Sequence, residues 1–356
     1  METKVEKVSK SNAPKELFRL PAICRAAKII RSGGIVAFPT ETVYGLGASG
    51  LNAAACRKIY EAKGRPSDNP LILHVANRAM VDCCAREVPE AAEKLMAAFM
   101  PGPLTLILPR KSEIPDVITG GLDTVGVRMP EHFAARALIK AAGVPIAAPS
   151  ANRSGRPSPT RAVSVLRHMK GRIPMILDGG ACRYGIESTI VDVTGDVPTI
   201  LRPGAITKEE IQELLGACEV DRALGGEGVP KAPGMKYRHY APKAEMFLLT
   251  GSPGKILAAM KRRMEMAQRA GKKVGILASE EIVAALAEKT DAALLKAYGR
   301  ENDLPAIAAN LYELLLAFDA TAADVILAEG TEECGLGLAI MNRMKKASSG
   351  RVESLD

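Results

Sequence analysis

The segment KGRPSDNPLILHV, residues 63–75, sets charged residues directly before a continuous apolar run. Lys63, Arg65 and Asp68 stand in a stretch broken by glycine and proline, and the apolar residues 71–73 follow at once. A surface loop needs no such apolar run, and a core strand needs no such charges. Polar side chains at the end of a buried strand are typical of ligand sites in α/β proteins. The segment therefore predicts an α/β fold that carries a ligand site at a strand end.

Outward from this segment, helical and extended patterns alternate without a strict strand–helix–strand order. A helix is predicted within residues 17–36, where it closes on a glycine pair before the strand IVAF. Further helices are predicted over 53–62 and 89–99, and short strands over 105–108, 124–128, 146–148, 175–177 and 189–193. This irregular order favours a twisted mixed sheet over a purely parallel one.

A change in pattern divides the chain. Residues 223–243 are rich in Gly and Pro and have no periodicity, which predicts a linker between a first domain, residues 1–222, and a second domain, residues 244–356. Behind the linker, four strand–helix units predict a small Rossmann-like parallel α/β domain, with helices over 255–270, 280–289, 304–318 and 338–346. No GxGxxG follows the first strand of that domain, so we predict no dinucleotide site there.

The composition bounds the class of protein. With 47% apolar and 25% charged residues, the chain fits a globular protein rather than a disordered one. The polar start METKVEKVSKSN does not resemble a signal peptide, and no apolar run is long enough to span a membrane. Seven cysteines without a CxxC pair favour free thiols, so we expect a cytoplasmic protein. The net charge of +8 suits nucleic acid or an anionic small ligand such as ATP, and charge alone does not decide between them.

Five further polar stretches accompany the predicted strands: FPTETVYGLGA (38–48), TVGVRMPEH (124–132), APSANRSGRPSPT (148–160), DGGACRYGIESTIVDV (178–193) and LRPGAIT (201–207). An arginine that ends an apolar strand, as Arg128 does, pairs with a carboxylate of the protein or of a ligand. Small hydroxyls and exposed N–H groups at a strand end suit phosphate oxygens. Each stretch alone also fits a plainer alternative. These are a strand-to-helix turn with an N-cap threonine for the first, a Ser/Pro loop for the third, and a solvated loop for KGRPSDNP.

Taken together, the stretches resemble a known family. FPTETVYGLGA, K-x-R-P-x-x-N-P-L, VGVRMP, P-S-A-N-x-S-G, ESTIVD and LRPGAI are similar to the YrdC-type domain of L-threonylcarbamoyladenylate synthases, from about Ile23 to Leu215. The linker ending in RHYAP and the small α/β domain behind it resemble the two-domain branch of that family. The resemblance therefore covers nearly the whole chain and implies a YrdC-like twisted mixed sheet in the first domain.

The resemblance also implies a reaction. Enzymes of this family combine L-threonine, bicarbonate or CO2, and ATP, and yield threonylcarbamoyl-AMP and pyrophosphate. The product feeds downstream threonylcarbamoyl transferase machinery that modifies tRNA to N6-threonylcarbamoyladenosine. Because a threonine carbamate attacking the α-phosphate builds negative charge, cations and N–H donors are the main requirement. We expect Mg2+ to arrive with ATP, without a tightly bound protein metal site, since no His/Cys/Asp/Glu cluster has ligand spacing.

Carried over position by position, the resemblance implies two sets of ligand residues. The residues expected to contact L-threonine are Thr42, His74, Arg128, Ala148 and Ser188. Those expected to contact ATP are Arg65, Asn69, Thr124, Ser150, Asn152, Ser158, Arg202 and Tyr240. Lys63 and Arg65 are assigned the catalytic role as cations for the phosphates, and Arg128 is expected to clamp the α-carboxylate of threonine.

Several of these assignments keep an alternative. Thr40 lies on the same short turn as Thr42 and fits the threonine contact as well. Ala148 stands where relatives often carry threonine, so only a backbone contact would persist there. By itself His74, a lone histidine in LILHVA, is more typical of a satisfied core histidine than of a ligand. Tyr240 lies in KAPGMKYRHYAPK, residues 231–243, which we expect to fold back over the first domain as a lid.

The sequence also fits two other classes of function. A double-stranded RNA or tRNA binding module would use the same basic charge, and direct contact with tRNA stays open. The Ser, Thr and Asn residues at strand ends favour a small enclosed ligand instead. A carbamoyl transferase of hydrogenase maturation contains a related domain, but it also carries zinc-type CxxC repeats and an acylphosphatase module, which this sequence does not show. ATP–pyrophosphate exchange that depends on threonine and bicarbonate separates the synthase from both.

Overall fold

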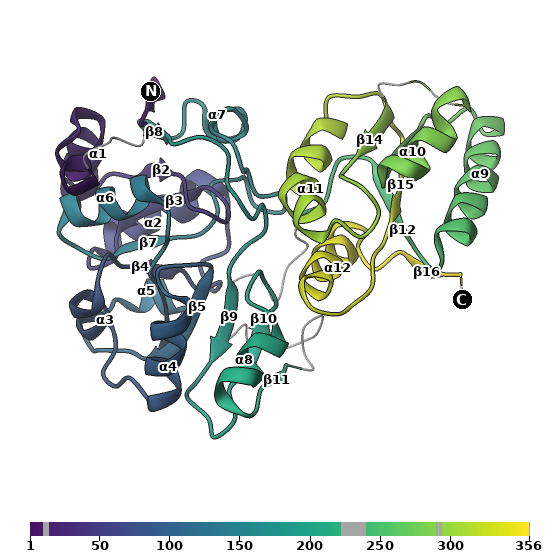
Figure 1. The fold of residues 1–356 in the computed structure, drawn as a ribbon. Coiled ribbons are helices and arrows are strands. Elements are labelled where there is room, and N and C mark those ends of the chain that lie inside the picture. The colour runs from purple at the N-terminus through teal and green to yellow at the C-terminus, as the bar shows by residue number, and fades with distance from the viewer. Residues whose placement is uncertain (10–13, 222–239, 290, 292–293, 356) are drawn as a thin grey trace. The chain divides into compact units, whose positions relative to one another are not determined.

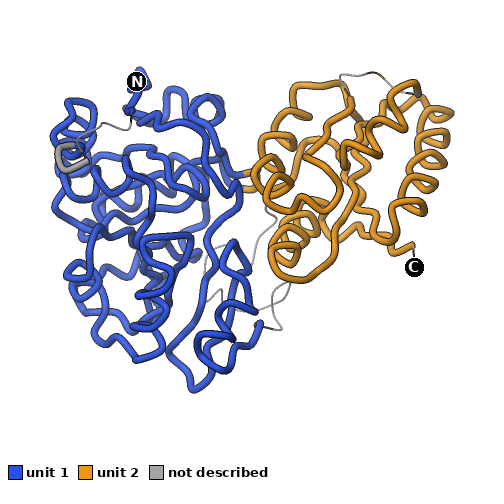
Figure 2. The backbone as a smooth tube through the Cα atoms, viewed as in Figure 1, with its two compact units in different colours: residues 1–154, 158–237 blue, residues 155–157, 238–356 orange. Residues whose placement is uncertain are grey.

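The computed structural model describes residues 1–9, 14–221, 240–289, 291 and 294–355. It divides the chain into a first unit, residues 1–154 and 158–237, and a second unit, residues 155–157 and 238–356 (Figure 2). The first unit contains a mixed sheet and the second a parallel one, so the predicted fold class is confirmed. The predicted lid falls mainly on residues outside the described ones. Within the described ranges, no helix is long and apolar enough to cross a membrane.

In the part of the chain that the structure describes, the sheet of the first unit has 11 strands (Figure 1). In spatial order they are β1 (Lys4–Lys7), β8 (Met175–Asp178), β2 (Val36–Phe38), β3 (Gly45–Ser49), β7 (Ile146–Ala148), β4 (Ile72–His74), β6 (Thr124–Arg128), β5 (Leu104–Pro109), β9 (Thr189–Asp192), β10 (Thr199–Arg202) and β11 (Glu219–Val220). Strand β4 pairs in parallel with β6 and antiparallel with β7. The parallel pairing sets His74 opposite Arg128, at the ends of both strands.

Helices cover both faces of this sheet. They are η1 (Pro14–Arg19), α1 (Pro21–Arg31), α2 (Ala53–Lys63), α3 (Arg78–Cys84), α4 (Glu90–Phe99), α5 (Asp116–Thr119), α6 (Phe133–Ala142), α7 (Ala162–Met169) and α8 (Lys208–Leu215). Successive residues of β2 divide between two buried clusters. Val36 and Phe38 pack with residues of α1 and α6, whereas Ala37 belongs to the cluster that includes residues of α2. Strands buried on both faces read as continuous apolar runs, which explains the run at residues 71–73.

Proline divides the first predicted helix into two elements. The structure has a 3-10 helix, η1, followed by α1, which begins at Pro21. Proline lacks the N–H that a helix interior needs, but the first turn leaves that N–H unpaired in any case. A single helix across residues 17–36 is therefore replaced by a short lead-in and an α-helix that starts at the proline.

The glycines of FPTETVYGLGA serve a strand rather than a strand-to-helix turn. Gly45–Ser49 form β3, which pairs antiparallel with β2. A Cβ atom at Gly47 would lie 2.7 Å from the ring of Phe38 and 2.6 Å from a methyl group of Ile146. Glycine inside a strand often marks such a close approach of neighbouring groups. The polar turn PTETV is thereby held between two paired strands.

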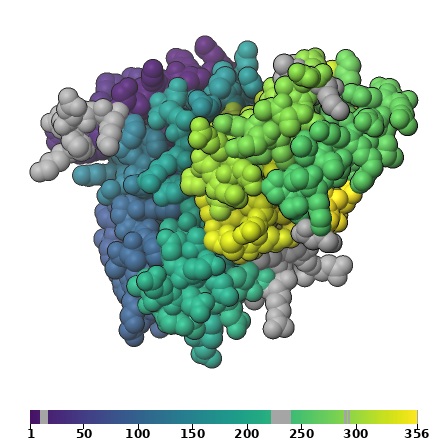
Figure 3. All heavy atoms as spheres, turned by 45° about the vertical axis from the view of Figure 1, so that its right-hand side comes forward, coloured from purple at the N-terminus to yellow at the C-terminus, as the bar shows by residue number. Residues whose placement is uncertain are grey.

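The second unit contains a sheet of five described strands, all paired in parallel. Their order is β14 (Leu295–Ala297), β13 (Val274–Ala278), β15 (Val325–Glu329), β12 (Glu245–Thr250) and β16 (Val352–Ser354). The helices are α9 (Pro253–Arg269), α10 (Glu280–Leu286), η2 (Ala287–Lys289), α11 (Leu304–Phe318) and α12 (Leu336–Ala347). In Figure 3 the residues of these helices are coloured from green to yellow. Strand β16 was not predicted, because three residues with two polar side chains carry no apolar pattern.

Candidate active site

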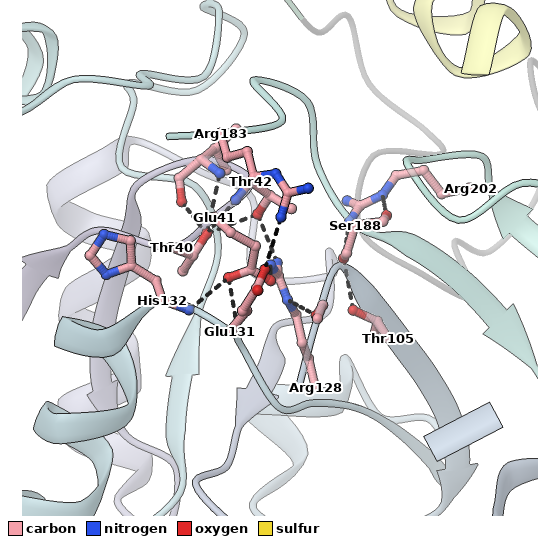
Figure 4. Close-up of polar contacts among 12 residues, drawn as sticks. Thr40, Glu41, Thr42, Thr105, Arg128, Glu131, His132, Arg183, Ser188 and Arg202 are labelled. Atoms are coloured by element: carbon pink, nitrogen blue, oxygen red, sulfur yellow. Dashed lines mark hydrogen bonds and ion pairs between the residues drawn. The ribbon is translucent and has the colours of Figure 1, made fainter. Parts of the chain in front are cut away.

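Buried polar side chains gather where strands of the first unit begin and end (Figure 4). They are Thr40, Glu41 and Thr42 after β2, Thr105 in β5, Arg128 at the end of β6, Ser188 before β9 and Arg202 at the end of β10. Buried polar groups are stable only when they find partners. The contacts among these residues therefore define the site.

Arg128 and Glu41 form an ion pair in which each side chain is only 4% exposed. Nη2 of Arg128 donates to Oε1 of Glu41 at 2.5 Å, and Nη1 donates to Oγ1 of Thr42 at 2.9 Å. The other carboxylate oxygen of Glu41 accepts the backbone N–H groups of Glu131 (3.0 Å) and His132 (3.3 Å). Burial raises the pKa of the Glu41 carboxyl, but the charge of Arg128 and its hydrogen bond lower it more, so that pKa lies below its ordinary value. Glu41 is therefore a carboxylate that fixes the Arg128 guanidinium.

The two threonines of the turn have different surroundings. Oγ1 of Thr40 accepts the backbone N–H groups of Thr42 and Val43, both at 3.2 Å, and donates to the carbonyl of Val43 at 2.6 Å. Oγ1 of Thr42 lies 2.8 Å from Oγ1 of Thr40 and accepts from Arg128. Thr40 thus shapes the turn, while Thr42 is the threonine that contacts the guanidinium.

Ser188 joins β5 to the cation at the end of β10. Oγ of Ser188 lies 2.8 Å from Oγ1 of Thr105 and accepts Nη2 of Arg202 at 3.1 Å. Nε of Arg202 donates to the carbonyl of Ser188 at 3.0 Å. The sequence stretches ESTIVD and LRPGAI therefore meet at a second fixed cation.

Lys63 holds the loop that contains Ser150 and Asn152. Its Nζ donates to the carbonyls of Ser150 (2.5 Å) and Asn152 (2.6 Å) and to Oδ1 of Asn152 (3.3 Å). Oγ of Ser150 donates to the same Oδ1 at 2.5 Å. Burial, and then the positive charge of Arg65, hold the pKa of the Lys63 amine well below its ordinary value. The sequence predicts a phosphate contact for Lys63. In the structure Lys63 also holds the P-S-A-N loop by hydrogen bonds to its backbone carbonyls, and this contact is called the Lys63 clamp below.

Arg65 and Asn69 lie together in KGRPSDNP. Nη2 of Arg65 donates to the carbonyls of Asn69 at 3.4 Å and Pro70 at 3.2 Å. The Asn69 side chain is buried, and its Oδ1 has no hydrogen-bond partner among the described residues. A buried acceptor without a partner costs free energy, so a ligand donor at this position would stabilise the loop.

The other predicted site residues occupy different parts of the fold. His74 is buried at the end of β4, with Nδ1 3.2 Å from the carbonyl of Ile72 and its ring edge-on to Phe38. Oγ of Ser158 donates to Oε1 of Glu187 at 2.7 Å. Thr124 begins β6, and Ala148 ends β7.

Tyr240 belongs to the second unit, where it is buried and stacks on Tyr312 of α11 with ring centroids 5.1 Å apart. Its proposed contact with ATP stays a prediction.

Sequence reasoning missed Glu41 and Thr105. The signal for Glu41 was available, because a buried arginine requires a counter-charge and FPTETV contains the acid. The sequence left open whether the protein or a ligand supplies the carboxylate that pairs with Arg128, and the protein supplies one. Nothing in the sequence marks Thr105 as a site residue, because threonine is common in β-strands.

Comparisons with known proteins cover both units. Residues 28–204 match the family described as Telomere recombination, and residues 206–349 match the family described as Threonylcarbamoyl-AMP synthase, C-terminal domain. The threonylcarbamoyl-AMP synthase of Pyrococcus abyssi is 49% identical over 92% of this chain and 94% of its own length, and that of Bacillus subtilis is 48% identical over 93% and 94%. The chain belongs to the threonylcarbamoyl-AMP synthase family.

Structural comparison agrees with this membership. The crystal structure of P. abyssi Sua5 complexed with L-threonine superposes with a TM-score of 0.90, at 46% identity over 99% of each chain. The resemblance to two-domain threonylcarbamoyl-AMP synthases is therefore confirmed, and the chain is an enzyme of that family. The buried clusters around Arg128 and Lys63 are the candidate active site of this family member.

The buried imidazole of His74 predicts acid sensitivity in this synthase family member. Burial, and then the charge of Arg128, lower the pKa of His74 to about 3, against about 6.5 in an unfolded chain. Because the unfolded state binds more protons between these values, this stabilisation is complete above about pH 6.5 and is lost as the pH falls toward 3. Between pH 7 and pH 5 we expect the wild type to lose about 2 kcal/mol more stability than His74→Gln in urea unfolding. Equal losses in the two proteins would contradict the buried neutral imidazole.

Proposed function

We propose that this protein joins L-threonine, bicarbonate or CO2, and ATP into threonylcarbamoyl-AMP and pyrophosphate. The observation that carries the proposal is the enclosed Arg128 guanidinium, fixed by Glu41 and Thr42 beside His74. A guanidinium has five N–H donors, and Gly102, Thr42 and Glu41 take three of those of Arg128, so the other two can bind the carboxylate of a small molecule. Membership of the synthase family and the L-threonine present in the P. abyssi complex support threonine as that molecule.

We place L-threonine at the strand ends around Arg128. In this proposal Arg128 binds the α-carboxylate, and Thr42, His74, Ala148 and Ser188 enclose the rest of the molecule. Arg128 and His74 lie opposite each other on β6 and β4, and Thr42 contacts the guanidinium. Burial of these groups strengthens each electrostatic contact relative to water.

We place ATP against the loops that follow α2 and β7. The proposed nucleotide contacts are Arg65, Asn69, Thr124, Ser150, Asn152, Ser158, Arg202 and Tyr240. Lys63 holds the backbone of residues 150–152, so the hydroxyl and amide of that loop are preorganised. Asn69 offers a buried acceptor without a described partner. Fixed cations and oriented N–H groups are what phosphoryl chemistry requires.

The reaction follows from these two placements. The uncharged amine of threonine adds to CO2 and forms a carbamate, and the proton lost from the nitrogen passes to solvent. A carbamate oxygen then bonds to the α-phosphorus of ATP while the bond to pyrophosphate breaks. Arg65 and Arg202 stabilise the negative charge that moves onto the phosphates, and Lys63 keeps the loop in place. No covalent intermediate with the protein is needed.

The proposal extends to the metal and to partners. Among the described residues, no three His, Cys, Asp or Glu side chains gather as a protein metal site would require, so Mg2+ would be carried on the ATP phosphates. We further propose that residues 1–222 form the catalytic domain, that residues 244–356 form a second domain, and that the protein acts in the cytoplasm. Its product would pass to threonylcarbamoyl transferase machinery acting on tRNA.

Exchange of pyrophosphate into ATP by the full-length protein tests the proposal. We expect exchange only when L-threonine and bicarbonate are both present, together with a product of the mass of threonylcarbamoyl-AMP. Exchange that needs neither substrate would contradict the proposed reaction. Absence of exchange combined with tight binding of double-stranded RNA would favour the RNA-binding alternative.

Replacing Arg65 by alanine should weaken ATP binding by about 1.5–3 kcal/mol, or roughly 10- to 150-fold in Kd, because one charge-assisted phosphate contact is lost. The measurement is calorimetric titration with ATP. Arg57→Ala is the control, since Arg57 is an exposed residue of the preceding helix α2. A folded Arg65→Ala protein with the wild-type Kd for ATP would remove Arg65 from the nucleotide site.

A further inference from the structure

Three residues of the nucleotide loop belong to the second unit. Residues 155–157 group with residues 238–356, although the chain before and after them belongs to the first unit (Figure 2). They interrupt P-S-A-N-R-S-G-R-P-S, which supplies the proposed ATP contacts Ser150, Asn152 and Ser158. Three residues in the middle of this loop therefore belong to the second unit, while the residues on both sides of them belong to the first.

Within the second unit, these residues are held by a defined set of contacts. Arg156 forms an ion pair with Asp319, and the two side chains are 26% and 14% exposed. Nη1 of Arg156 also donates to the carbonyl of Ala241 at 3.4 Å, and the N–H of Ala241 donates to the carbonyl of Gly155 at 3.1 Å. Side-chain and backbone contacts thus fix the same short segment.

The position of Asp319 is informative. It caps the C-terminus of α11, where the helix dipole disfavours a negative charge. Both carboxylate oxygens have partners: Oδ2 pairs with Arg156, and Oδ1 accepts the N–H of Lys243 at 2.8 Å. The Nζ of Lys243 also lies 3.4 Å from the carbonyl of Asp319. An acid in this unfavourable place is best explained by the two segments that it joins, residues 155–157 and the end of the linker.

Asp319 follows a helix, α11, that is packed in the core of the second unit. Tyr312, Leu315 and Phe318 of α11 are buried, and Tyr240 stacks on Tyr312. Through its ion pair with Asp319, Arg156 is therefore connected to a helix that packs in the core of the second unit.

On the other side, the neighbours of the segment are tied to the proposed active site. The N–H of Ser154 donates to the carbonyl of Lys63 at 3.0 Å, and Oγ of Ser158 donates to Glu187 at 2.7 Å. Ser154 and Ser158 each lie two residues from Arg156, and consecutive Cα atoms are only about 3.8 Å apart. A displacement of Arg156 would therefore also move these two neighbours.

We propose that the Arg156–Asp319 ion pair is a positioning contact by which the second unit sets the geometry of the nucleotide loop. This inference rests on the proposed ATP site in that loop. It gives the second domain a role in nucleotide binding that does not involve direct contact of Asp319 with ATP. Threonine binding around Arg128 should be largely independent of it.

Charge reversal tests the proposal on the full-length protein. Arg156→Asp and Asp319→Arg should each raise the Kd of a non-hydrolysable ATP analogue at least tenfold, while the Kd of L-threonine stays within twofold. The double variant Arg156→Asp/Asp319→Arg should return the analogue Kd to within about threefold of wild type, because the pair is restored with reversed polarity. Arg153→Asp is the control, as it places the same charge change on an exposed residue of the same loop.

The remaining outcomes also decide the matter. Wild-type analogue affinity in both single variants, or no recovery in a folded double variant, would overturn the proposal. If a reversal prevents folding, as judged by thermal unfolding, Asp319→Asn provides the milder variant. It keeps an acceptor for the N–H of Lys243 and removes the charge, so unchanged analogue affinity in Asp319→Asn would equally overturn the role of the pair. A wild-type protein that binds no ATP analogue would instead defeat the proposed function, and this inference with it.

Discussion

Replacing Arg128 by methionine is expected to lower the free energy of unfolding by about 3–5 kcal/mol and to abolish measurable binding of L-threonine. The loss of stability follows because the Glu41 carboxylate, 4% exposed, would remain buried without its counter-charge. The loss of binding follows because Arg128 is the proposed partner of the α-carboxylate. Urea unfolding measures the first effect and calorimetric titration the second.

Two further variants separate these effects. In Arg128→Met/Glu41→Leu both buried charges are gone, so much of the lost stability should return while threonine binding stays absent. Arg110→Met is the control, because Arg110 pairs at 2.6 Å with Asp116, whose side chain is 77% exposed. An ion pair with an exposed partner should contribute no more than about 1 kcal/mol. If Arg128→Met keeps the wild-type Kd for L-threonine, the threonine site must lie elsewhere.

Replacing Lys63 by methionine should weaken ATP binding by at least about 100-fold, which corresponds to about 2.8 kcal/mol. The Lys63 amine donates to both loop carbonyls, and each acceptor left without a donor costs about 1–3 kcal/mol. The loop that carries Ser150 and Asn152 would then lose its fixed shape. Lys58→Met is the control, since Lys58 lies on the same helix, is exposed, and donates at 2.7 Å to the carbonyl of Gly33. Near-wild-type ATP affinity in Lys63→Met would show that the clamp does not matter.

The same variant makes a pH-dependent prediction. Burial, and then Arg65, lower the pKa of Lys63, whereas an unfolded lysine keeps its proton to about pH 10.4. Between the lowered pKa and pH 10.4 the unfolded state binds more protons, so this residue makes the protein more stable as the pH rises through that window. Lys63→Met should lack that rise. If the free energy of unfolding changes with pH in the same way in the wild type and in Lys63→Met, the Lys63 amine is not buried and hydrogen-bonded as described.

Local patterns in the sequence were sufficient to predict the four α-helices and the first four strands of the second unit, but not β16. The apolar positions Ile307, Leu311, Leu315 and Phe318 are buried in α11, which has the predicted bounds Leu304–Phe318. Periodicity works here because each helix faces a parallel sheet with one apolar stripe. The chemistry-bearing stretches were also visible, since each places polar residues at the beginning or the end of an apolar strand.

The partners of those polar residues were decided only by the tertiary structure. Glu41 and Arg128 are 87 residues apart, and Lys63 and Ser150 likewise. Sequence spacing does not give the order of strands in a mixed sheet, and that order brings β4 beside β6 and β3 beside β7. The placement of residues 155–157 in the second unit has the same origin. Hydrophobic periodicity reports which face of an element is buried, whereas charge pairing depends on which elements become neighbours, and only the folded chain determines that.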